Sequence, residues 1–240
     1  MAEEVVPGVY DLPMSIVHAY LVVASEVTLI DSGYPGWSER ILREFAGRNQ
    51  QIGQVRHVIV THYHVDHAGS AADLKEATGA TVYAHPADAA YIRGEKPHEG
   101  PFPRGLVDRL IAPIWFRRTA RYRRILKAAT IDHELTDGEQ LSIGDGLQII
   151  HTPGHTPGHV SVLMPSKKIL FVGDAAANMF GLRAPVGTLF GLATANIALA
   201  KESMRKLAAL EFDIACFGHG RVLRSEANLA FRRSVERLAR

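Results

Sequence analysis

The chain contains little cysteine and no long apolar run, and its first residues lack the pattern of a secretory signal. The single cysteine, Cys216, excludes an internal disulfide bond and fits a reducing compartment. No apolar stretch reaches the roughly 18 residues that a membrane-crossing helix needs, so we expect no membrane partner. Residues 1–7 are acidic and are not followed by an apolar core, which argues against a secretory signal. We therefore predict a cytoplasmic protein.

Charge of one sign is also scarce. The 240 residues carry a formal net charge of +2, 22% of them are charged and 47% are hydrophobic. A nearly neutral chain gives little reason to expect nucleic acid as a partner. The hydrophobic content is sufficient for one large core, and no linker or low-complexity segment divides the chain. We predict one domain over residues 1–240 that acts on a small-molecule substrate.

The most informative segment lies at 61–67 and reads Thr-His-Tyr-His-Val-Asp-His, directly after the apolar run 58–60. His62 and His64 are two positions apart, so on an extended chain their side chains point the same way and can share one ion. Asp66 and His67 are adjacent and can reach a second ion once the chain turns toward a helix. Neutral imidazoles and a carboxylate are ligands of hydrolytic metal sites. The alternative interpretation, a polar loop that merely caps a helix, does not require such a cluster.

Three later segments repeat this arrangement of an apolar strand followed by a ligand-type side chain. His155 lies between two Pro-Gly pairs, which hold it on a stiff loop. Asp174 follows the apolar run 169–172 and a glycine, and His219 stands between two glycines after another apolar run. Each of these signals is weak alone. Together, four strand ends that each deliver a metal-ligand side chain predict a common metal site.

With these residues the sequence resembles the metallo-β-lactamase-fold hydrolases, from about Val9 to Gly220. The resemblance rests on the HxHxDH motif at 62–67 and on the three later ligand-type residues. It implies two metal ions and a carboxylate, Asp174, that bridges them. One ion would be held by His62, His64 and His155. The other would be held by Asp66, His67 and His219. Asp31, in an early strand-turn element, would either support the site from below or serve as a turn residue.

Strand-like and helix-like segments alternate in two similar halves, which predicts two sheets packed face to face with helices outside each. The resemblance implies the same α+β architecture, a four-layer αββα sandwich with the metal site along one edge. We expect strands at 9–12, 19–24, 27–31, 55–61, 81–85, 140–143, 147–151, 159–164, 168–172 and 213–217, and helices at 36–47, 68–78, 86–93, 196–209 and 225–238.

A helical insertion is expected around 98–130, broken near Pro113. Between Arg104 and Lys127 there are eight Lys or Arg residues and one acidic residue, mixed with apolar side chains. Three interpretations stay open. The segment covers the core with a solvated basic face, forms a lid that shapes the substrate pocket, or makes a homodimer contact through Trp115 and Phe116.

The predicted donors also indicate the chemistry. Imidazole and carboxylate ligands without a thiolate suit two Zn²⁺ ions best, and iron or manganese is permitted. Two divalent ions with Asp66, Asp174 and one bridging hydroxide leave a small positive charge, which stabilises an oxyanion formed by attack on a carbonyl. We predict that this hydroxide is the nucleophile. Asp66 would be the catalytic residue that orients the nucleophile and carries a proton to the leaving group.

The substrate class follows from the resemblance. The complete ligand set is most similar to hydroxyacylglutathione hydrolases and acyl-homoserine lactonases, which implies a thioester, lactone or related ester. A β-lactam hydrolase is an alternative, although zinc β-lactamases usually place a cysteine where this chain has Asp174. A mononuclear iron enzyme that oxidises persulfides shares the fold and the HxHxDH motif, and is a second alternative. A non-catalytic metal-stabilised module is a third, disfavoured because every ligand position is filled.

Overall fold

The computed structural model describes residues 2–46, 55–179 and 191–238, and its strands form two sheets. The first has seven strands in chain order, β1 to β7, and the second has five in the order β12-β11-β10-β9-β8. The strands of the first sheet are β1 (Glu3–Val6), β2 (Val9–Met14), β3 (Val17–Val23), β4 (Val27–Ile30), β5 (Val55–Ile59), β6 (Thr81–Ala84) and β7 (His133–Glu134). Those of the second are β8 (Gln140–Leu141), β9 (Leu147–His151), β10 (Val160–Met164), β11 (Ile169–Gly173) and β12 (Ile214–Phe217).

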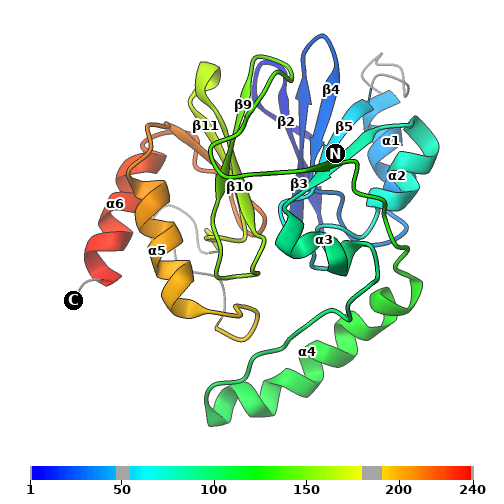
Figure 1. Ribbon diagram of the computed structural model, residues 1–240. Helices are drawn as coiled ribbons and strands as arrows, with labels where there is room; N and C mark the ends of the chain where they lie inside the picture. Colours follow the sequence, from blue (N-terminus) through cyan, green and yellow to red (C-terminus); the bar gives the residue numbers. More distant parts are fainter. Residues whose placement is uncertain (1, 47–54, 180–190, 239–240) are drawn as a thin grey trace.

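Helices cover the outer face of each sheet (Figure 1). The helices are α1 (Ser38–Ala46), α2 (Ala71–Thr78), α3 (Pro86–Ile92), α4 (Leu106–Ile125), α5 (Ile197–Ala208) and α6 (Ala227–Leu238). Side chains of α1 and α2 pack into the core beside the first sheet. Those of α5 and α6 pack into a separate core beside the second sheet. The predicted αββα sandwich is confirmed.

The strand sequences explain why both faces of each sheet are buried. On β10, Val160 and Val162 belong to the core between the sheets, whereas Leu163 belongs to the core beneath α5 and α6. On β11, Phe171 faces the other sheet and Leu170 faces the helices. Successive strand side chains point to opposite faces, so a continuous apolar run fills two cores at once.

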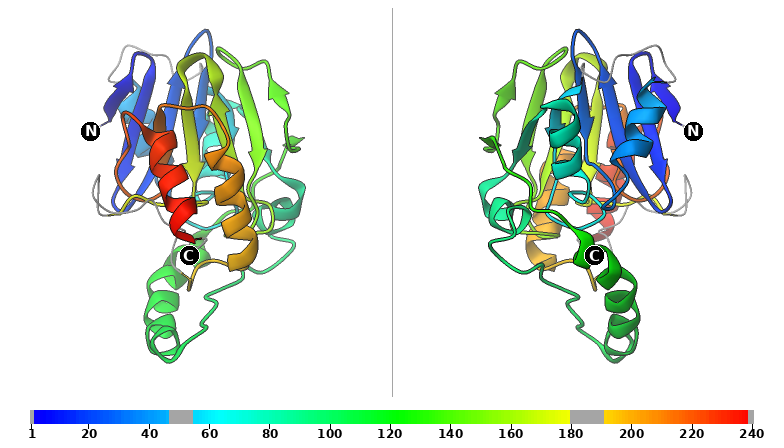
Figure 2. Two further views of the ribbon diagram at one scale, coloured as in Figure 1. Left: turned by 90° about the vertical axis from the view of Figure 1, so that its left-hand side faces the viewer. Right: turned by 90° about the vertical axis from the view of Figure 1, so that its right-hand side faces the viewer.

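Strand direction brings the predicted ligand loops to one edge. β4, β5 and β6 run parallel, as do β11 and β12, so the loops that follow them leave from the same ends. Helix α4 lies beyond this edge, below both sheets (Figures 1 and 2). The directions of the strands alone therefore bring the ligand loops to one edge of the sandwich.

Two predicted helices differ from the structure. The insertion was expected to break near Pro113, but α4 continues through it as one 20-residue helix. Proline removes one backbone hydrogen bond and crowds the carbonyl four residues earlier, but the helix continues on both sides of the exposed Pro113. The helix expected from Ala68 begins at Ala71, because turns closed by bonds from the His67 and Ala68 amides to the His64 carbonyl occupy the preceding residues.

Other predictions concern features that the structure does not test. The assignment of 1–240 to one domain stays a prediction. The side chains of Trp115 and Phe116 lie outside the described residues, so the dimer contact expected there also stays a prediction. Within the described ranges, no helix combines the length and the apolar character needed to cross a membrane.

The core between the sheets should dominate stability. Phe171 is 1% exposed and its ring lies 5.5 Å from that of Tyr20 on the opposite sheet. We expect Phe171→Ala to lower the free energy of unfolding by about 3–5 kcal/mol, measured by urea denaturation, because a cavity replaces the ring. Leu229→Ala, on the exposed side of α6, is the control and should cost less than about 1 kcal/mol. Equal losses would contradict the assignment of this layer as the main core.

Candidate metal centre

The structure brings the seven predicted side chains into two adjoining groups at the edge below the sheets. Within each group, one ligand atom from every residue lies within 4.8 Å of all the others. The first group consists of His62, His64, His155 and Asp174, and the second of Asp66, His67 and His219. Six of the seven residues are buried, and Asp66 is partly exposed. Residues separated by up to 157 positions in the chain thus share one small volume.

In the first group, three ring nitrogens face one another. His64 Nδ1 lies 3.1 Å from His62 Nε2 and 2.9 Å from His155 Nε2. The carboxylate of Asp174 joins them, with Oδ2 3.3 Å from His155 Nε2 and 3.8 Å from His62 Nε2. Three imidazole nitrogens and one carboxylate oxygen directed at a common point match the donor set of a zinc site.

The second group faces the other side of the same carboxylate. Asp66 Oδ2 lies 3.4 Å from His219 Nε2 and 4.0 Å from His67 Nε2. Asp174 Oδ1 lies 3.5 Å from His67 Nε2, and Asp174 Oδ2 lies 3.4 Å from His219 Nε2. Asp174 therefore stands between the two groups, where the resemblance requires a bridging carboxylate.

Unsatisfied polar atoms test whether cations fit these groups. Among the described residues, His67 Nε2 and Asp174 Oδ1 are buried without any hydrogen-bond partner. Such atoms cost free energy unless a ligand occupies the space in front of them. Both belong to the two converging groups, and all seven donors are imidazole or carboxylate. The residues fit a pair of divalent ions of the zinc, iron or manganese kind.

A hydrogen-bond chain from Asp31 orients His62. The Thr61 hydroxyl donates to Asp31, with 2.9 Å between the oxygens, and lies 3.0 Å from His62 Nδ1. Because the hydroxyl proton goes to Asp31, Thr61 accepts from His62 Nδ1–H. This network assigns the His62 tautomer and leaves the Nε2 lone pair directed into the site.

Asp31 also holds His67. Its Oδ2 lies 2.8 Å from His67 Nδ1, which directs Nε2 toward Asp66 and Asp174. Asp31 sits at the end of β4 with φ of 63°, so it has the conformation of a turn residue as well. Asp31 therefore has both of the roles considered for it: it lies in a turn, and from there it supports the site. A carboxylate behind a ligand histidine fixes the ring and raises its basicity.

Asp88, which sequence reasoning missed, ties the two ligand loops together. Its carboxylate accepts from the Tyr63 amide at 3.0 Å, the Thr156 hydroxyl at 2.6 Å and the Gly158 amide at 2.6 Å. Burial raises the pKa of this carboxyl to about 6, although the three donors oppose the shift. The sequence offered only an acidic residue in the first turn of α3, which is common in any helix.

His159, four residues after His155, supports the backbone at Asp174. Its Nε2 accepts from the Asp174 amide at 2.8 Å, and its Nδ1 lies 2.8 Å from the Thr152 hydroxyl. Burial and the imidazole of His155 lower the pKa of His159, so the ring is neutral and accepts at Nε2. Both ring nitrogens are occupied, and His159 is a support for the bridging carboxylate.

The loop that carries His219 is fixed from the opposite sheet. The Ile16 carbonyl lies 2.7 Å from His219 Nδ1. Tyr20 on β3 donates to the Phe217 carbonyl at 2.8 Å. Gly218 passes so close to the centre that a Cβ there would lie 2.2 Å from Asp174 Oδ1. A side chain at position 218 would therefore occupy the space between the two groups.

Electrostatics differ between the groups when no cation is bound. Burial, followed by neighbouring imidazoles, lowers the pKa of His62 and of His64 well below the usual range. Burial also opposes the charge of His67, but Asp174, Asp31 and Asp66 outweigh it and raise its pKa to about 9. Burial also opposes the charge of His219, but Asp174 and Asp66 outweigh it and raise its pKa. His62 and His64 are therefore neutral at pH 7, whereas His67 and His219 hold protons.

Two stacked sheets with helices outside, and a His/Asp cluster at one edge, define a class of metal-binding αββα proteins. A family model described as the metallo-beta-lactamase superfamily matches residues 12–219. That match spans most of the chain, so the protein belongs to the metallo-β-lactamase superfamily. Membership and the His/Asp cluster together support a metal-dependent hydrolase.

Relatives of this chain include hydrolases. A probable metallo-hydrolase, YflN, of Bacillus subtilis is 30% identical over 232 residues, covering 90% of this chain and 85% of that protein. A hydroxyacylglutathione hydrolase of Cereibacter sphaeroides is 28% identical over 208 residues, covering 84% of this chain and 62% of its own length. A metallo-β-lactamase family protein of Thermus thermophilus superimposes with a TM-score of 0.71 at 21% identity, covering 98% of this chain and 81% of that one. At that identity the superposition shows the fold alone.

The close approach at Gly218 gives a test of the centre. Gly218→Ala should lower zinc affinity by at least about tenfold, because the new Cβ collides with Asp174 and His67. Gly105→Ala, where a Cβ meets nothing within 4 Å, should leave affinity unchanged. Zinc competition with a chromophoric chelator measures both variants. Unchanged affinity in Gly218→Ala would contradict the position of the ions.

The protonated histidines predict that zinc binding to the second group releases protons. Below about pH 9 an ion must displace a proton from His67, and His219 behaves alike, so affinity there should rise with pH. The first group, whose His62 and His64 are already neutral, should show a weaker dependence. Titration calorimetry in buffers of different ionisation enthalpy measures the proton release of each step. Equal release in both steps would contradict the described difference.

Proposed function

We propose that this protein hydrolyses a small thioester, lactone or related ester at a dinuclear metal site, with zinc as the resident metal. The observation that carries the proposal is the position of Asp174 between two complete groups of ligand atoms. Similarity to the hydroxyacylglutathione hydrolase of Cereibacter sphaeroides supports the ester or thioester class. A small molecule, rather than nucleic acid, stays the proposed partner.

The residues of the site have different roles in the proposed hydrolysis. A pair of bound divalent ions would supply hydroxide at neutral pH, by lowering the pKa of water to about 7, and would polarise a carbonyl. Asp174 sets the spacing of the two ligand groups. Asp66, whose side chain is 19% exposed, is the member of the second group most open to solvent and substrate. Its Oδ2 would orient the attacking water and then hold the proton that passes to the leaving group.

Two alternatives make different use of the same residues. A mononuclear iron enzyme that oxidises persulfides would use only the first group. The compactness of Asp66, His67 and His219 favours a second ion and therefore hydrolysis. A β-lactam substrate has support only from solved metallo-β-lactamases such as MIM-2, which is 22% identical and thus shows the fold.

The proposal is tested with zinc-loaded protein and a panel of thioesters, lactones, esters and β-lactams. We expect Asp66→Ala and His219→Ala each to lower kcat/KM on the best substrate by at least about 100-fold, because both residues belong to the second group. Elemental analysis should find two metal ions per chain in the original protein and fewer in the variants.

An exposed histidine outside the centre provides the control. His133 is 44% exposed and pairs with Glu139, so His133→Ala should retain full activity and metal content. If turnover survives both Asp66→Ala and His219→Ala, the two-metal proposal is wrong. One iron per chain with oxygen consumption on a persulfide would establish the oxidative alternative.

A further inference from the structure

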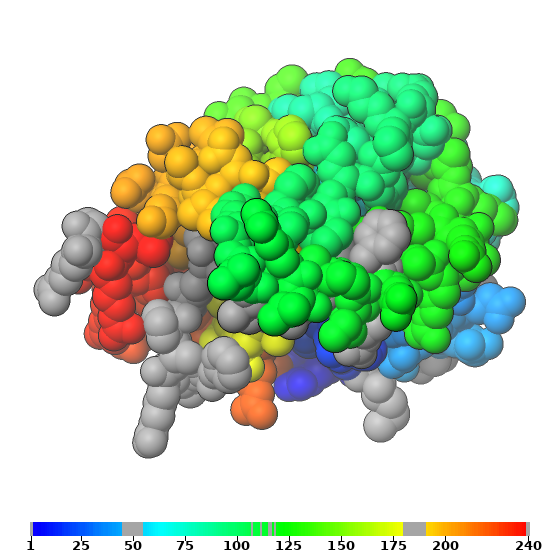
Figure 3. Space-filling model, turned by 90° about the horizontal axis from the view of Figure 1, so that it is seen from below, coloured from blue at the N-terminus to red at the C-terminus, as the bar shows by residue number. Residues whose placement is uncertain are grey.

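Helix α4 turns one of its faces away from the rest of the protein. Just before the helix, Arg104 donates to the carbonyls of Thr194 and Ala195 at 2.6 and 3.0 Å. Near its C-terminal end, the ring of Tyr122 stacks on that of Tyr34, with centroids 4.3 Å apart. Seen from below, α4 lies across the face on which the ligand loops emerge (Figure 3). These contacts fix the inner side of the helix, so its opposite side is directed outward.

The exposed residues of α4 are of only two kinds, as far as its side chains are described. All of them are aliphatic or arginine: Leu106, Arg109, Leu110, Pro113, Ile114, Arg117, Arg121, Arg124 and Ile125. Leu106, Leu110 and Ile114 are 80%, 75% and 61% exposed. Residues four positions apart lie on the same side of a helix, so these three form one stripe, which the later arginines continue. The nine residues together are named the outer α4 face.

The outer α4 face carries positive charge without local compensation. It holds four arginines and no acidic residue. Asp108 lies elsewhere on the helix and accepts from the Arg104 amide at 3.1 Å. Within the described residues, the arginines that form ion pairs belong to other segments, and they are Arg43, Arg93, Arg224 and Arg232. The exposed aliphatic side chains therefore lie among unneutralised guanidinium groups.

A second copy of the chain does not complement this face. The stripe of Leu106, Leu110 and Ile114 occupies the N-terminal half of α4, and most of the arginines follow in the C-terminal half. A two-fold dimer joins the same patch of both copies. An antiparallel pair of these helices would set the aliphatic half of one on the arginines of the other. A parallel pair would set arginine on arginine. Charge complementarity thus requires an anionic partner.

We propose that the outer α4 face binds an anionic lipid surface, with its aliphatic side chains inserted among the lipids and its arginines bound to their phosphate groups. Burial of aliphatic surface and attraction to anionic lipids are the two contributions that hold a helix in the plane of a membrane interface. A guanidinium binds phosphate oxygens in pairs. The expectation of no membrane partner rests on the lack of a membrane-crossing segment, which a surface contact does not need.

Composition and shape favour lipid over an acidic protein. Protein interfaces are enriched in aromatic anchors and contain directional hydrogen bonds to polar groups. The described part of the outer α4 face offers no aromatic side chain and no neutral polar one. The helix is about 30 Å long and is the outermost element at this end of the molecule (Figures 1 and 2). A flat anionic surface can therefore contact the whole face at once.

Vesicle binding tests the proposal without any substrate. Cosedimentation of the full chain is measured with vesicles of phosphatidylcholine and with vesicles of equal parts phosphatidylcholine and phosphatidylglycerol. We expect a partition coefficient at least about tenfold higher on the anionic vesicles, because each arginine near the surface adds to the attraction. This binding should weaken as salt is added. Equal binding to both kinds of vesicle, or binding to neither, would overturn the proposal.

Paired substitutions separate the two contributions. Arg117→Gln with Arg124→Gln should lower the partition coefficient on anionic vesicles by at least about tenfold. Leu110→Ala combined with Ile114→Ala should lower it by a similar factor, because less aliphatic surface leaves water.

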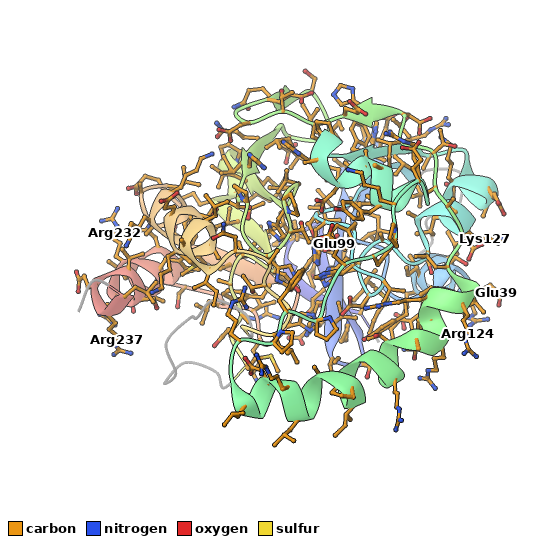
Figure 4. The ribbon with its side chains drawn as sticks, turned by 60° about the horizontal axis from the view of Figure 1, so that its bottom comes forward. Glu39, Glu99, Arg124, Lys127, Arg232 and Arg237 are labelled. Atoms are coloured by element: carbon orange, nitrogen blue, oxygen red, sulfur yellow. The ribbon has the colours of Figure 1, made fainter. Side chains whose placement is uncertain are left out.

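Exposed residues of α6 provide the matched control. Leu229 and Arg237 are both exposed, and Arg237 projects from α6 whereas Arg124 projects from α4 (Figure 4). Leu229→Ala with Arg237→Gln should leave vesicle binding unchanged. An equal loss in all three double variants would overturn the assignment to the outer α4 face. All the variants keep every proposed metal ligand, so an unchanged zinc content shows that they are folded.

Two further measurements distinguish the other partners. Sedimentation velocity in the absence of lipid should find a monomer. A dimer that dissociates in the variant with Leu110→Ala and Ile114→Ala would overturn the proposal in favour of a second copy. Polyglutamate that binds the protein as tightly as anionic vesicles do would overturn it in favour of an acidic protein. None of these outcomes depends on whether the protein hydrolyses an ester, so the proposed function is tested separately.

Discussion

The structure depends on a single carboxylate, that of Asp174, held among the imidazoles of both ligand groups. A buried carboxylate is costly unless its charge is compensated, and here the compensation comes from His67, on a loop of the first sheet, and His219, on a loop of the second. The backbone must approach the Asp174 carboxylate closely for both groups of imidazoles to surround it. Gly173 adopts φ of 57°, and Gly218 leaves no space for a Cβ. The Asp174 amide donates to His159, which fixes the backbone that carries the carboxylate.

The HxHxDH loop is held by two further carboxylates on opposite sides. Asp31, at the end of β4, binds Thr61 and His67. Asp88, from α3, binds the Tyr63 amide and also the loop that carries His155. Each carboxyl group accepts several hydrogen bonds from within the protein. These hydrogen bonds tether the loop to β4 and α3 independently of any metal ion, and so help to hold the ligand nitrogens facing one another.

Much of this arrangement could be predicted, because its signals are local in the sequence. The motif at 62–67 and the ligand-type residues after later apolar runs identified all seven converging side chains. The support by Asp88 and His159 could not be predicted, since the Asp88 partner Gly158 is 70 positions away and no local pattern records such a pair. The continuity of α4 through Pro113 also escaped prediction, because proline penalises a helix without deciding whether its neighbours continue it.

The insertion concentrates positive charge in one segment of a nearly neutral chain. The stretch from Arg104 to Lys127 has eight basic residues and one acidic residue, an excess larger than the net charge of the whole chain. The remainder is therefore net negative, and the positive charge is concentrated on one segment. That segment lies across the face on which the ligand loops emerge (Figure 3), so its charges contribute to the electrostatic potential outside the candidate metal centre. The net charge of the whole chain therefore says little about the electrostatic potential near the candidate metal centre.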